Sequence, residues 1–473
     1  MLGGIFAILL AFVLFVREQW SYLELSFRIP RVKGIPFIGV ITNLKFLKDS
    51  LTTLDTFIRK LGDLVFFWVG PFPVVLISNA DLAEKVLTSK NCLDKPFTYL
   101  AIAKNTGDGL FTLSANKWHE HRKLLNPSFY QKVLKNFIPI FNEGANYIVC
   151  QLAEDSTDIS HLIFKTSLNI AAETTMGKKM SIEGSTDLLP HYKKALTTIS
   201  DTTTKPWIYL NSKVIQSNRK IKQFTRNSIK EKQLEMKESE LKSNSEVSWK
   251  NSIFINQVLD LVQKKKLSES EAEIEALVMV FGAFETTASV LYSALICLAM
   301  YQDCQEILFD EITSVVGNED DITFEHLTEM PYMDMVISEV LRLLPAVPYV
   351  GRKVSEDTDF DRFVAPKGLQ FLISIYHIHR SEEYWGPSPE TFDPENFLPH
   401  RVAERHPFAY IPFTKGARNC IGRQYALFSL KIMLAKIIRK YKFSTTWKLS
   451  DLQFKMAVTL KLKEMPDLKV IPR

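Results

Sequence analysis

The chain begins with an almost purely apolar stretch. Residues 1–16 contain no charged side chain, and the first charges are Arg17 and Glu18. A run of this kind, extended to residue 20 by the interfacial aromatic Trp20, is typical of a membrane anchor. A cleaved signal peptide is the alternative, but the segment lacks the basic start and the small-residue cleavage site of such peptides. The pattern therefore predicts one retained N-terminal anchor over residues 1–20.

The region after this anchor is basic and rich in turn-forming residues. Because basic residues favour the cytosolic side of a membrane span, Arg17, Arg28, Arg31 and Lys33 indicate that the rest of the chain lies in the cytosol. Prolines stiffen the backbone and glycines permit turns, so residues 21–39 are expected to form a hinge. The residues of this hinge pattern are Pro30, Gly34, Pro36 and Gly39.

Hydrophobic patterning beyond residue 40 is mostly helical. Residues 64–78 are an exception, because β-branched and aromatic residues broken by a Gly-Pro turn predict strands. Residues 219–250 are charged and serine-rich, which is typical of a solvated helix followed by a mobile loop. We find no repeat and no linker that divides the globule. We therefore expect one large domain over residues 40–473, mainly α with a small β portion.

Residues 276–300 form a second long apolar stretch with two interpretations. By length and composition it can be a transmembrane helix. Its middle, however, holds Gly282, Glu285, Thr286 and Thr287, and a carboxylate at the centre of a bilayer is costly. A helix that is apolar all round with a polar break is better interpreted as the buried central helix of a large globule, with the break facing a functional site.

Composition narrows the class of protein. A chain of 473 residues with 46% hydrophobic content exceeds the usual limit for one core, which favours either two domains or one domain built around a large cofactor. The net charge of +5 is small, and no basic stripe interleaved with aromatics predicts nucleic-acid binding. Five cysteines, an odd number without metal-type spacing, argue against a disulfide framework and for a reducing compartment.

One cysteine, Cys420, lies in a glycine-bracketed loop just before a long helical pattern. Gly416 and Gly422 are expected to take conformations closed to other residues and to let backbone amides approach the sulfur. Such amides, together with a helix N-terminus, stabilise a thiolate. Arg418 suits a carboxylate such as a haem propionate, and Phe413 can shield the sulfur from water. The alternative is that Cys420 is a small buried hydrophobic residue, as most lone cysteines are.

The spacing of this loop carries a family resemblance. Phe413-x-x-Gly416-x-Arg418-x-Cys420-x-Gly422 resembles the haem-binding signature of the cytochrome P450 superfamily at every fixed position. The resemblance implies the cytochrome P450 fold and haem b, with Cys420 as the axial thiolate ligand of the iron. A thiolate pushes electron density onto iron and favours cleavage of the O–O bond.

Three further motifs agree with this resemblance in the expected order along the chain. Glu339 and Arg342 form an ExxR motif that resembles the structural ion pair of the family. Trp118 and Arg122 form a WxxxR motif, and Arg352 follows the Glu339 segment. The resemblance implies that these last three bind haem propionates, whereas each taken singly is also compatible with surface packing.

The polar break at Gly282 resembles the oxygen-binding motif of the family. The resemblance implies that Glu285 and Thr286 deliver protons during oxygen activation, which consumes two protons. In the alternative, Thr286 bonds back to a helix carbonyl and bends the helix. Two positions depart from the family pattern. Gly282 cannot form the ester to haem that a glutamate makes in the fatty-acid-hydroxylating branch, and Asn396 replaces the arginine expected beside Glu339 and Arg342.

These features together predict a monooxygenase that inserts oxygen into an apolar small molecule: a lipid, a hormone or a xenobiotic such as an insecticide. No GxGxxG follows a predicted strand, so electrons must come from a separate flavoprotein. The resemblance implies NADPH-cytochrome P450 reductase, with cytochrome b5 as a further possible donor. It also implies a microsomal location in the endoplasmic reticulum membrane, in a family-4-like branch found in insects. Basic side chains that can attract an acidic donor are Lys415, Arg423 and Lys431, although a solvated face accounts for them as well.

Two other functions remain open at this point. One is a haem-thiolate isomerase or dehydratase that acts on a preformed peroxide, and the other is a non-enzymatic haem-binding membrane protein. Residues 95–113 and 188–217 are expected to line the substrate site, and their mixed apolar and hydroxyl side chains suit many small molecules.

Overall fold

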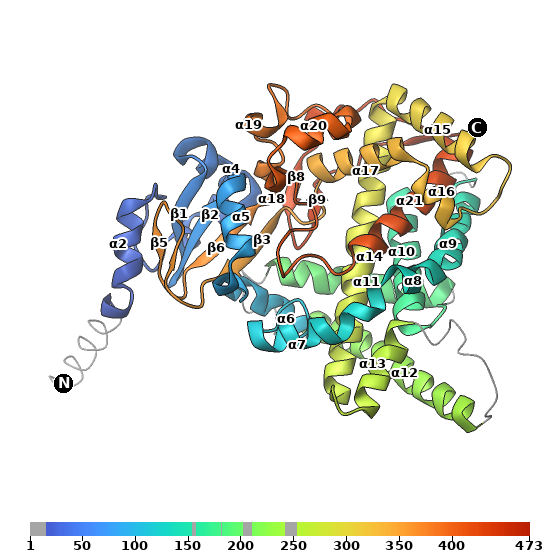
Figure 1. Cartoon of the computed structure of the whole chain (residues 1–473), viewed down its shortest axis with the longest axis horizontal. Coiled ribbons are helices and arrows are strands. Elements are labelled where there is room, and N and C mark those ends of the chain that lie inside the picture. The colour runs from blue at the N-terminus through green and yellow to red at the C-terminus, as the bar shows by residue number, and fades with distance from the viewer. Residues whose placement is uncertain (1–15, 154–157, 181, 202–210, 242–252) are drawn as a thin grey trace. The chain divides into compact units, whose positions relative to one another are not determined.

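The computed structural model describes residues 16–153, 158–180, 182–201, 211–241 and 253–473 (Figure 1). The chain divides into two compact units. Unit 1 comprises Met1–Pro96, Tyr349–Ile378 and His406–Asn419, and unit 2 comprises Phe97–Pro348, His379–Arg405 and Cys420–Arg473. Most of the predicted anchor lies outside the described residues. The boundaries of the anchor, the hinge and the large domain stay predictions.

Unit 1 is built around a small sheet. Its helices are α2 (Trp20–Arg28), α3 (Leu44–Lys48), α4 (Ser50–Leu61), α5 (Ala80–Thr88) and α18 (Ile375–Ile378). Its strands are β1 (Leu64–Val69), β2 (Phe72–Ile77), β3 (Tyr349–Lys353), β4 (Thr358–Asp359), β5 (Val364–Ala365) and β6 (Gln370–Ser374).

The four-stranded sheet of unit 1 has the order β1-β2-β6-β3. Strands β1 and β2 form the hairpin predicted over residues 64–78, and the turn between them contains Gly70 with a φ of 60°. Strand β6 runs parallel to β2 and antiparallel to β3, so distant parts of the chain share one sheet. Every residue of β1 is buried, because helices cover it and Phe57 of α4 packs on Phe67 with ring centroids 6.0 Å apart.

The predicted hinge region runs along β1. The N–H of Val32 donates to the carbonyl of Phe66 at 2.9 Å, and the N–H of Phe66 donates to the carbonyl of Pro30 at 2.8 Å. Further along, the N–H of Gly70 donates to the carbonyl of Ile38 at 3.1 Å. Hydrogen bonds thus hold residues 30–39 against the sheet, while hinge motion itself stays a prediction.

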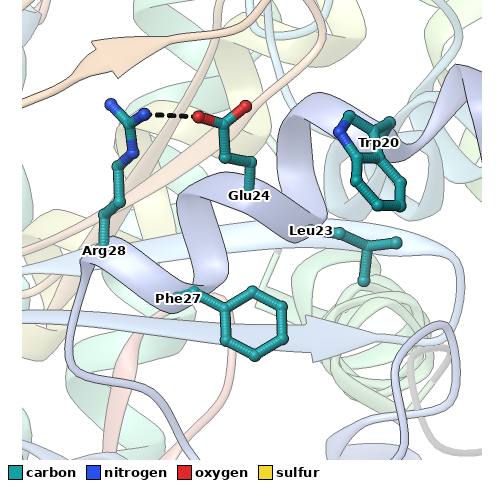
Figure 2. Close-up of a pocket in the computed structure, with 5 residues that line it drawn as sticks. All are labelled: Trp20, Leu23, Glu24, Phe27 and Arg28. Carbon is teal, nitrogen blue, oxygen red and sulfur yellow. Dashed lines mark hydrogen bonds and ion pairs between the residues drawn. The ribbon is translucent and has the colours of Figure 1, made fainter.

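Helix α2 presents apolar side chains on its surface. Figure 2 shows a pocket on this helix lined by Trp20, Leu23, Glu24, Phe27 and Arg28, with Glu24 and Arg28 paired. Trp20 and Phe27 are 62% and 72% exposed. Single exposed apolar residues are common. Trp20 and Phe27 are about two helical turns apart on α2, next to a predicted membrane anchor, and exposed aromatic residues of this kind suit a lipid interface. No residue of the candidate active site lines this pocket.

Unit 2 is mainly helical. Its longer helices are α6 (Leu100–Thr106), α7 (Ala115–Leu125), α9 (Ile138–Gln151), α10 (Ile159–Met176), α11 (Ile182–Asp201), α12 (Ser212–Leu241), α13 (Phe254–Gln263), α14 (Glu269–Met300), α15 (Gln302–Val316), α17 (Pro331–Leu343) and α21 (Arg423–Lys440). Shorter elements are α8 (Gln131–Leu134), α16 (Phe324–Thr328), α19 (Glu382–Trp385), α20 (Pro399–Glu404), β7 (Tyr441–Ser444), β8 (Phe454–Met456), β9 (Leu460–Leu462) and β10 (Lys469–Pro472). The expected fold class, mainly α with a small β portion, is confirmed.

Helix α14 is the central helix of unit 2 (Figure 1). Its first turn is fixed by a capping box, in which Ser268 and Glu271 each satisfy the backbone amide of the other. Among the described residues it is the one helix long and apolar enough to cross a membrane, yet most of its apolar window is buried inside the protein. This burial agrees with the interpretation of residues 276–300 as a core helix.

The charged segment 219–250 is helical through its first part, as predicted. It belongs to α12, whose charged residues are largely exposed. The mobile loop predicted after the helix falls largely on residues 242–252, which lie outside the described residues.

The ExxR motif forms a fully buried ion pair on α17. Glu339 and Arg342 are 0% exposed, and two hydrogen bonds of 2.7 Å join the guanidinium to the carboxylate. Arg342 also donates to the carbonyls of His379, Pro389 and Thr391. These acceptors lie in the connections before and after α19, which have no regular structure, so the pair stabilises both connections.

Asn396 retains part of the role expected of the missing arginine. Its Nδ2 donates to Oε1 of Glu339 at 3.3 Å, and the N–H of Asp393 donates to the same oxygen at 2.8 Å. Arg405 lies nearby, with its guanidinium carbon 3.8 Å from the ring centroid of Trp385 and its Nη2 donating to the Asn396 carbonyl at 2.9 Å. A single amide therefore replaces a charged contact, and the pair remains fully hydrogen-bonded.

Substitution of Glu339 by Ala is expected to lower the free energy of unfolding by about 3–5 kcal/mol, because it leaves the Arg342 charge buried without its carboxylate. The exposed i,i+4 pair of Asp260 and Lys264 provides the control, and Asp260→Ala should cost about 0.5 kcal/mol. Urea denaturation followed by circular dichroism measures both. Equal costs for the two variants would contradict a structural role for the buried pair.

Candidate active site

Cys420 immediately precedes the helix start that was expected to stabilise its thiolate. Helix α21 begins at Arg423, with Gly422 as its N-cap residue. The thiol is solvent-accessible yet closely surrounded by protein, and burial raises its pKa. A hydrogen bond from the Gly422 backbone and the charges of Arg122 and Arg423 lower the pKa in opposition. These three groups favour the thiolate, whereas burial, the largest influence, favours the thiol. The metal-binding role of Cys420 stays a prediction.

The two glycines of the loop have different roles. Gly416 has a φ of 76°, and a Cβ there would lie 2.0 Å from the Leu87 carbonyl oxygen, so only glycine fits. Gly422 has a φ of −89°, and a Cβ there would have no neighbour within 4 Å. The expectation that both glycines adopt conformations closed to other residues is therefore wrong for Gly422, which contributes its amide instead.

Trp118 and Arg122 lie one turn apart on α7, as predicted. Trp118 is buried, and Nε of Arg122 donates to Oδ1 of Asn126 at 2.8 Å. Burial lowers the pKa of Arg122, and the nearby Cys420 acts in the opposite direction. The structure of unit 2 thus brings an arginine of the WxxxR motif into electrostatic range of the candidate thiolate.

Unit 1 contains a second group of cations. Arg352 on β3 is 1% exposed and Arg418 is 7% exposed. The pKa of Lys95 is well below its ordinary value, because of burial first and then the positive charges of Arg352 and Arg418. Two arginines and a lysine so close together suit an anionic ligand with more than one carboxylate, which is the chemistry of haem propionates. Phe413, on the same loop as Arg418, is partly buried.

Lys95 was not predicted as a site residue. It lies in the segment 95–113 that the sequence assigned to the substrate site, and a single lysine in a loop carries no periodic signal. Its neighbours come from parts of the chain far away in sequence, so only the folded unit identifies it.

Glu285 and Thr286 are neighbours on α14 but have different partners. The hydroxyl of Thr286 donates to the Gly282 carbonyl at 2.7 Å, which is the back-bonded geometry of the structural alternative. Glu285 is 1% exposed, and its Oε1 lies 3.1 Å from both the Thr459 hydroxyl and Nζ of Lys461. Its Oε2 is buried and has no hydrogen-bond partner among the described residues. Thr459 and Lys461, beside and within β9, were not anticipated from the sequence.

The basic side chains expected to attract an electron donor differ in exposure. Lys431 is buried and donates to the Leu327 carbonyl and the Asp334 carboxylate, each at 2.7 Å. Its charge is neutralised inside unit 2, so the expectation that it attracts a partner is wrong. Lys415 donates to the Pro407 carbonyl, and Arg423 is exposed.

Comparison with known proteins identifies the family of this chain. The family profile described as "Cytochrome P450" matches residues 30–465. "Probable cytochrome P450 313a4" of Drosophila melanogaster is 38% identical over 488 residues, covering 98% of both chains. "Cytochrome P450 4c21" of Blattella germanica is 30% identical and covers 95% of this chain and 94% of its own.

This chain belongs to the cytochrome P450 family and is a monooxygenase of the oxidoreductase class. The insect relatives, with a family-4 protein among them, confirm the predicted resemblance. Cytochromes P450 hold haem through a cysteine thiolate, and the thiol of Cys420 and the cations of each unit fit such a group.

Replacement of Gly416 by Ala is expected to destabilise unit 1 by at least about 2 kcal/mol more than replacement of Gly70 by Ala. Both glycines have positive φ, which costs a Cβ about 1–2 kcal/mol, but a Cβ at Gly70 would meet open space. Urea unfolding of the two variants separates the cost of a side chain at positive φ from the cost of the collision with Leu87. Equal destabilisation would contradict the close approach at Gly416.

Proposed function

We propose that this protein is a membrane-anchored monooxygenase that inserts one atom of O2 into an apolar small molecule, with Cys420 as the thiolate ligand of haem b. The observation that carries the proposal is the position of Cys420 three residues before α21, beside the Gly422 backbone donor and within reach of the charges of Arg122 and Arg423. Burial raises the thiol pKa, and these three groups oppose that effect. Haem bound there supplies the activation of O2. The chain's own residues hold it, exclude water and supply protons.

The cofactor-binding role extends to the cations of both units. Trp118 and Arg122 in unit 2, and Arg352 and Arg418 in unit 1, are proposed to bind the haem carboxylates. Lys95 joins this set, because burial first and then the two arginines beside it lower its pKa, and an anion would favour its charged form. Phe413 is proposed to keep water from the sulfur. Glu339 and Arg342 are assigned to folding, as their burial supports.

Glu285 and Thr286 are proposed to supply the protons that oxygen reduction consumes. The buried Oε2 of Glu285 has no hydrogen-bond partner among the described residues. This oxygen can therefore accept a new hydrogen bond if the carboxylate rotates away from Lys461. Thr286 provides a hydroxyl on the next residue of the same helix. A partly exposed Lys461 beside the acid suits a route from solvent, since its side chain is 26% exposed.

The electron donor is proposed to be NADPH-cytochrome P450 reductase, with cytochrome b5 as a further donor. Exposed Arg423, close in sequence to Cys420, supports an acidic partner surface. The apolar segment 1–20 and the exposed Trp20 and Phe27 of α2 support an anchor in the endoplasmic reticulum membrane, with the body in the cytosol. Apolar substrates partition into the same membrane.

One observation favours a second candidate function. Thr286 bonds to the Gly282 carbonyl and not to Glu285, which is the arrangement expected if no proton relay operates. A haem-thiolate isomerase or dehydratase acting on a preformed peroxide needs neither the relay nor a reductase.

The reduced, carbon-monoxide-treated spectrum of the membrane-bound protein tests the ligand. The wild-type protein is expected to give the Soret band of a thiolate-ligated haem, and Cys420→Ala is expected to abolish that band because no other sulfur replaces it. Cys150→Ala, at an exposed cysteine, is the control and should leave the band unchanged. A histidine-type band that persists in Cys420→Ala would refute the assignment.

Replacement of Thr286 by Ala tests the relay. Product formed per NADPH oxidised should fall by about tenfold or more, with hydrogen peroxide released instead, because proton delivery fails. Thr287→Ala, which removes a neighbouring buried hydroxyl, should change this ratio less than about twofold. Unchanged turnover in Thr286→Ala, together with activity on an organic peroxide without reductase, would establish the second candidate instead.

A further inference from the structure

Glu275 of α14 is a buried acid to which the proposed reaction assigns no role. Its side chain is 0% exposed, and both of its oxygens are used. Oε1 lies 2.7 Å from Nδ1 of His121 on α7, and Oε2 accepts the N–H of Leu110 at 3.1 Å. One carboxylate therefore joins α14 to α7 and to residues 107–114, the connection between α6 and α7. Such partners offset the cost of burying a charge.

The connection 107–114 lies directly on α14. A Cβ at Gly107, whose φ is 92°, would lie 2.6 Å from Ile274, and a Cβ at Gly109 would lie 2.9 Å from the same side chain. The amides of Thr112 and Leu113 both donate to the Gly109 carbonyl, which closes a compact turn. The two glycines thus permit the contact, and the Glu275 carboxylate fixes it.

This contact determines where the ring of Phe111 lies. The ring is 43% exposed, and its Cζ would be 3.3 Å from a Cβ at Gly282. Gly282 lies about two helical turns beyond Glu275 and directly precedes the segment with Glu285 and Thr286. A half-exposed aromatic ring at this position restricts the bulk of any molecule that approaches these residues.

We propose that Glu275 and His121 are positioning residues that hold the connection 107–114, so that Phe111 admits slim apolar groups beside Gly282 and excludes bulky ones. The proposal rests on the monooxygenase function, because it concerns substrate selection at that site. His121 also lies between Trp118 and Arg122 on α7, which are proposed to bind haem carboxylates. The same contact therefore holds this helix in place.

The charges around His121 give the contact a pH dependence. Glu275 and Glu271 face the imidazole from α14, with Nε2 3.7 Å from Oε1 of Glu271, and Lys117 lies on α7 itself. The hydrogen bond to Glu275 raises the pKa of His121 against the effect of burial. Because the pKa of His121 is raised in the folded protein, the contribution of its protonation to stability is complete below the ordinary histidine pKa of about 6.5. That contribution is lost as the pH rises through the pKa of the folded state.

Hydrogen exchange of the purified, haem-loaded protein tests the contact without reference to activity. Exchange in the peptide containing residues 107–114 should accelerate by about tenfold in Glu275→Gln. In the wild-type protein it should also accelerate between pH 6 and pH 9, beyond the intrinsic effect of pH. His121→Asn retains a donor near the position of Nδ1 but cannot titrate, so the excess pH dependence should disappear.

Binding of two imidazole probes tests the consequence for selection. Phe111→Ala should tighten binding of 1-tritylimidazole relative to 1-octylimidazole by about tenfold in spectral titrations, because the space beside Gly282 widens. Glu275→Gln should shift the ratio in the same direction. Glu273→Gln is the control, since Glu273 lies on the same helix and pairs with Arg226 at the surface; it should change neither exchange nor the ratio by more than about twofold.

Two results would overturn the proposal. One is wild-type exchange of residues 107–114 in Glu275→Gln together with an unchanged pH dependence of exchange in His121→Asn, and the other is an unchanged probe ratio in Phe111→Ala. The failure of the monooxygenase function has a separate signature. A wild-type protein without a thiolate-type carbon-monoxide spectrum would refute that function, whatever the exchange of the Glu275 variants.

Discussion

The proposed chemistry depends on a negative charge on the Cys420 sulfur, in surroundings where burial favours the neutral thiol. Burial is the largest influence on this group, and it raises the pKa. The opposing influences are the Gly422 backbone hydrogen bond, the charge of Arg122 from α7 and the charge of Arg423 from the first turn of α21. Iron would add a much stronger positive charge, since a coordinated thiol is deprotonated outright. The protein's hydrogen-bond donor and positive charges thus favour the thiolate in part, and coordination to iron would complete the deprotonation of the thiol.

Helix α14 carries the remaining determinants of unit 2 in sequence order. Glu275 fixes the connection 107–114, Gly282 leaves room for the Phe111 ring, and Glu285 and Thr286 follow on the next turn. Glu275, Glu285 and Thr286 each have a specific polar neighbour, which offsets the cost of placing them in a buried helix. The Lys461 contact to Glu285 adds the β9 segment to the same centre. The connection 107–114 and β9 therefore both contact α14, through Glu275 and Glu285, close to Gly282 and Thr286.

The fold elements and motifs that rest on local chemistry could be predicted from the sequence. A run of β-branched and aromatic residues broken by Gly-Pro gave the β1–β2 hairpin, and the polar break in residues 276–300 distinguished a core helix from a membrane span. The ion pair of the ExxR motif was expected from its i,i+3 spacing together with the family resemblance, and the assignment of Cys420 rests on that resemblance and stays a prediction. Helix α2 was not predicted, because its residues were interpreted as the end of an anchor and the start of a hinge.

Partners brought together by the fold could not be predicted. Lys431 has the pattern of a solvated helix residue, yet Asp334 from α17 neutralises it. Lys95 acquires its role from Arg352 and Arg418, which are distant in sequence. Glu275 was not identified, because it lies just before the apolar stretch 276–300; it is buried, and His121 and Leu110 pair with its two oxygens. In each case the deciding group lies on another element, so no local pattern contains it.

The most direct test of the account is iron K-edge X-ray absorption of the purified protein in its resting state. The account predicts one sulfur scatterer in the first coordination shell of the iron, lost when Cys420 is replaced by Ala and retained when Cys150 is replaced. A shell of nitrogen and oxygen alone in the wild-type protein, or a sulfur that survives the Cys420 replacement, would contradict it.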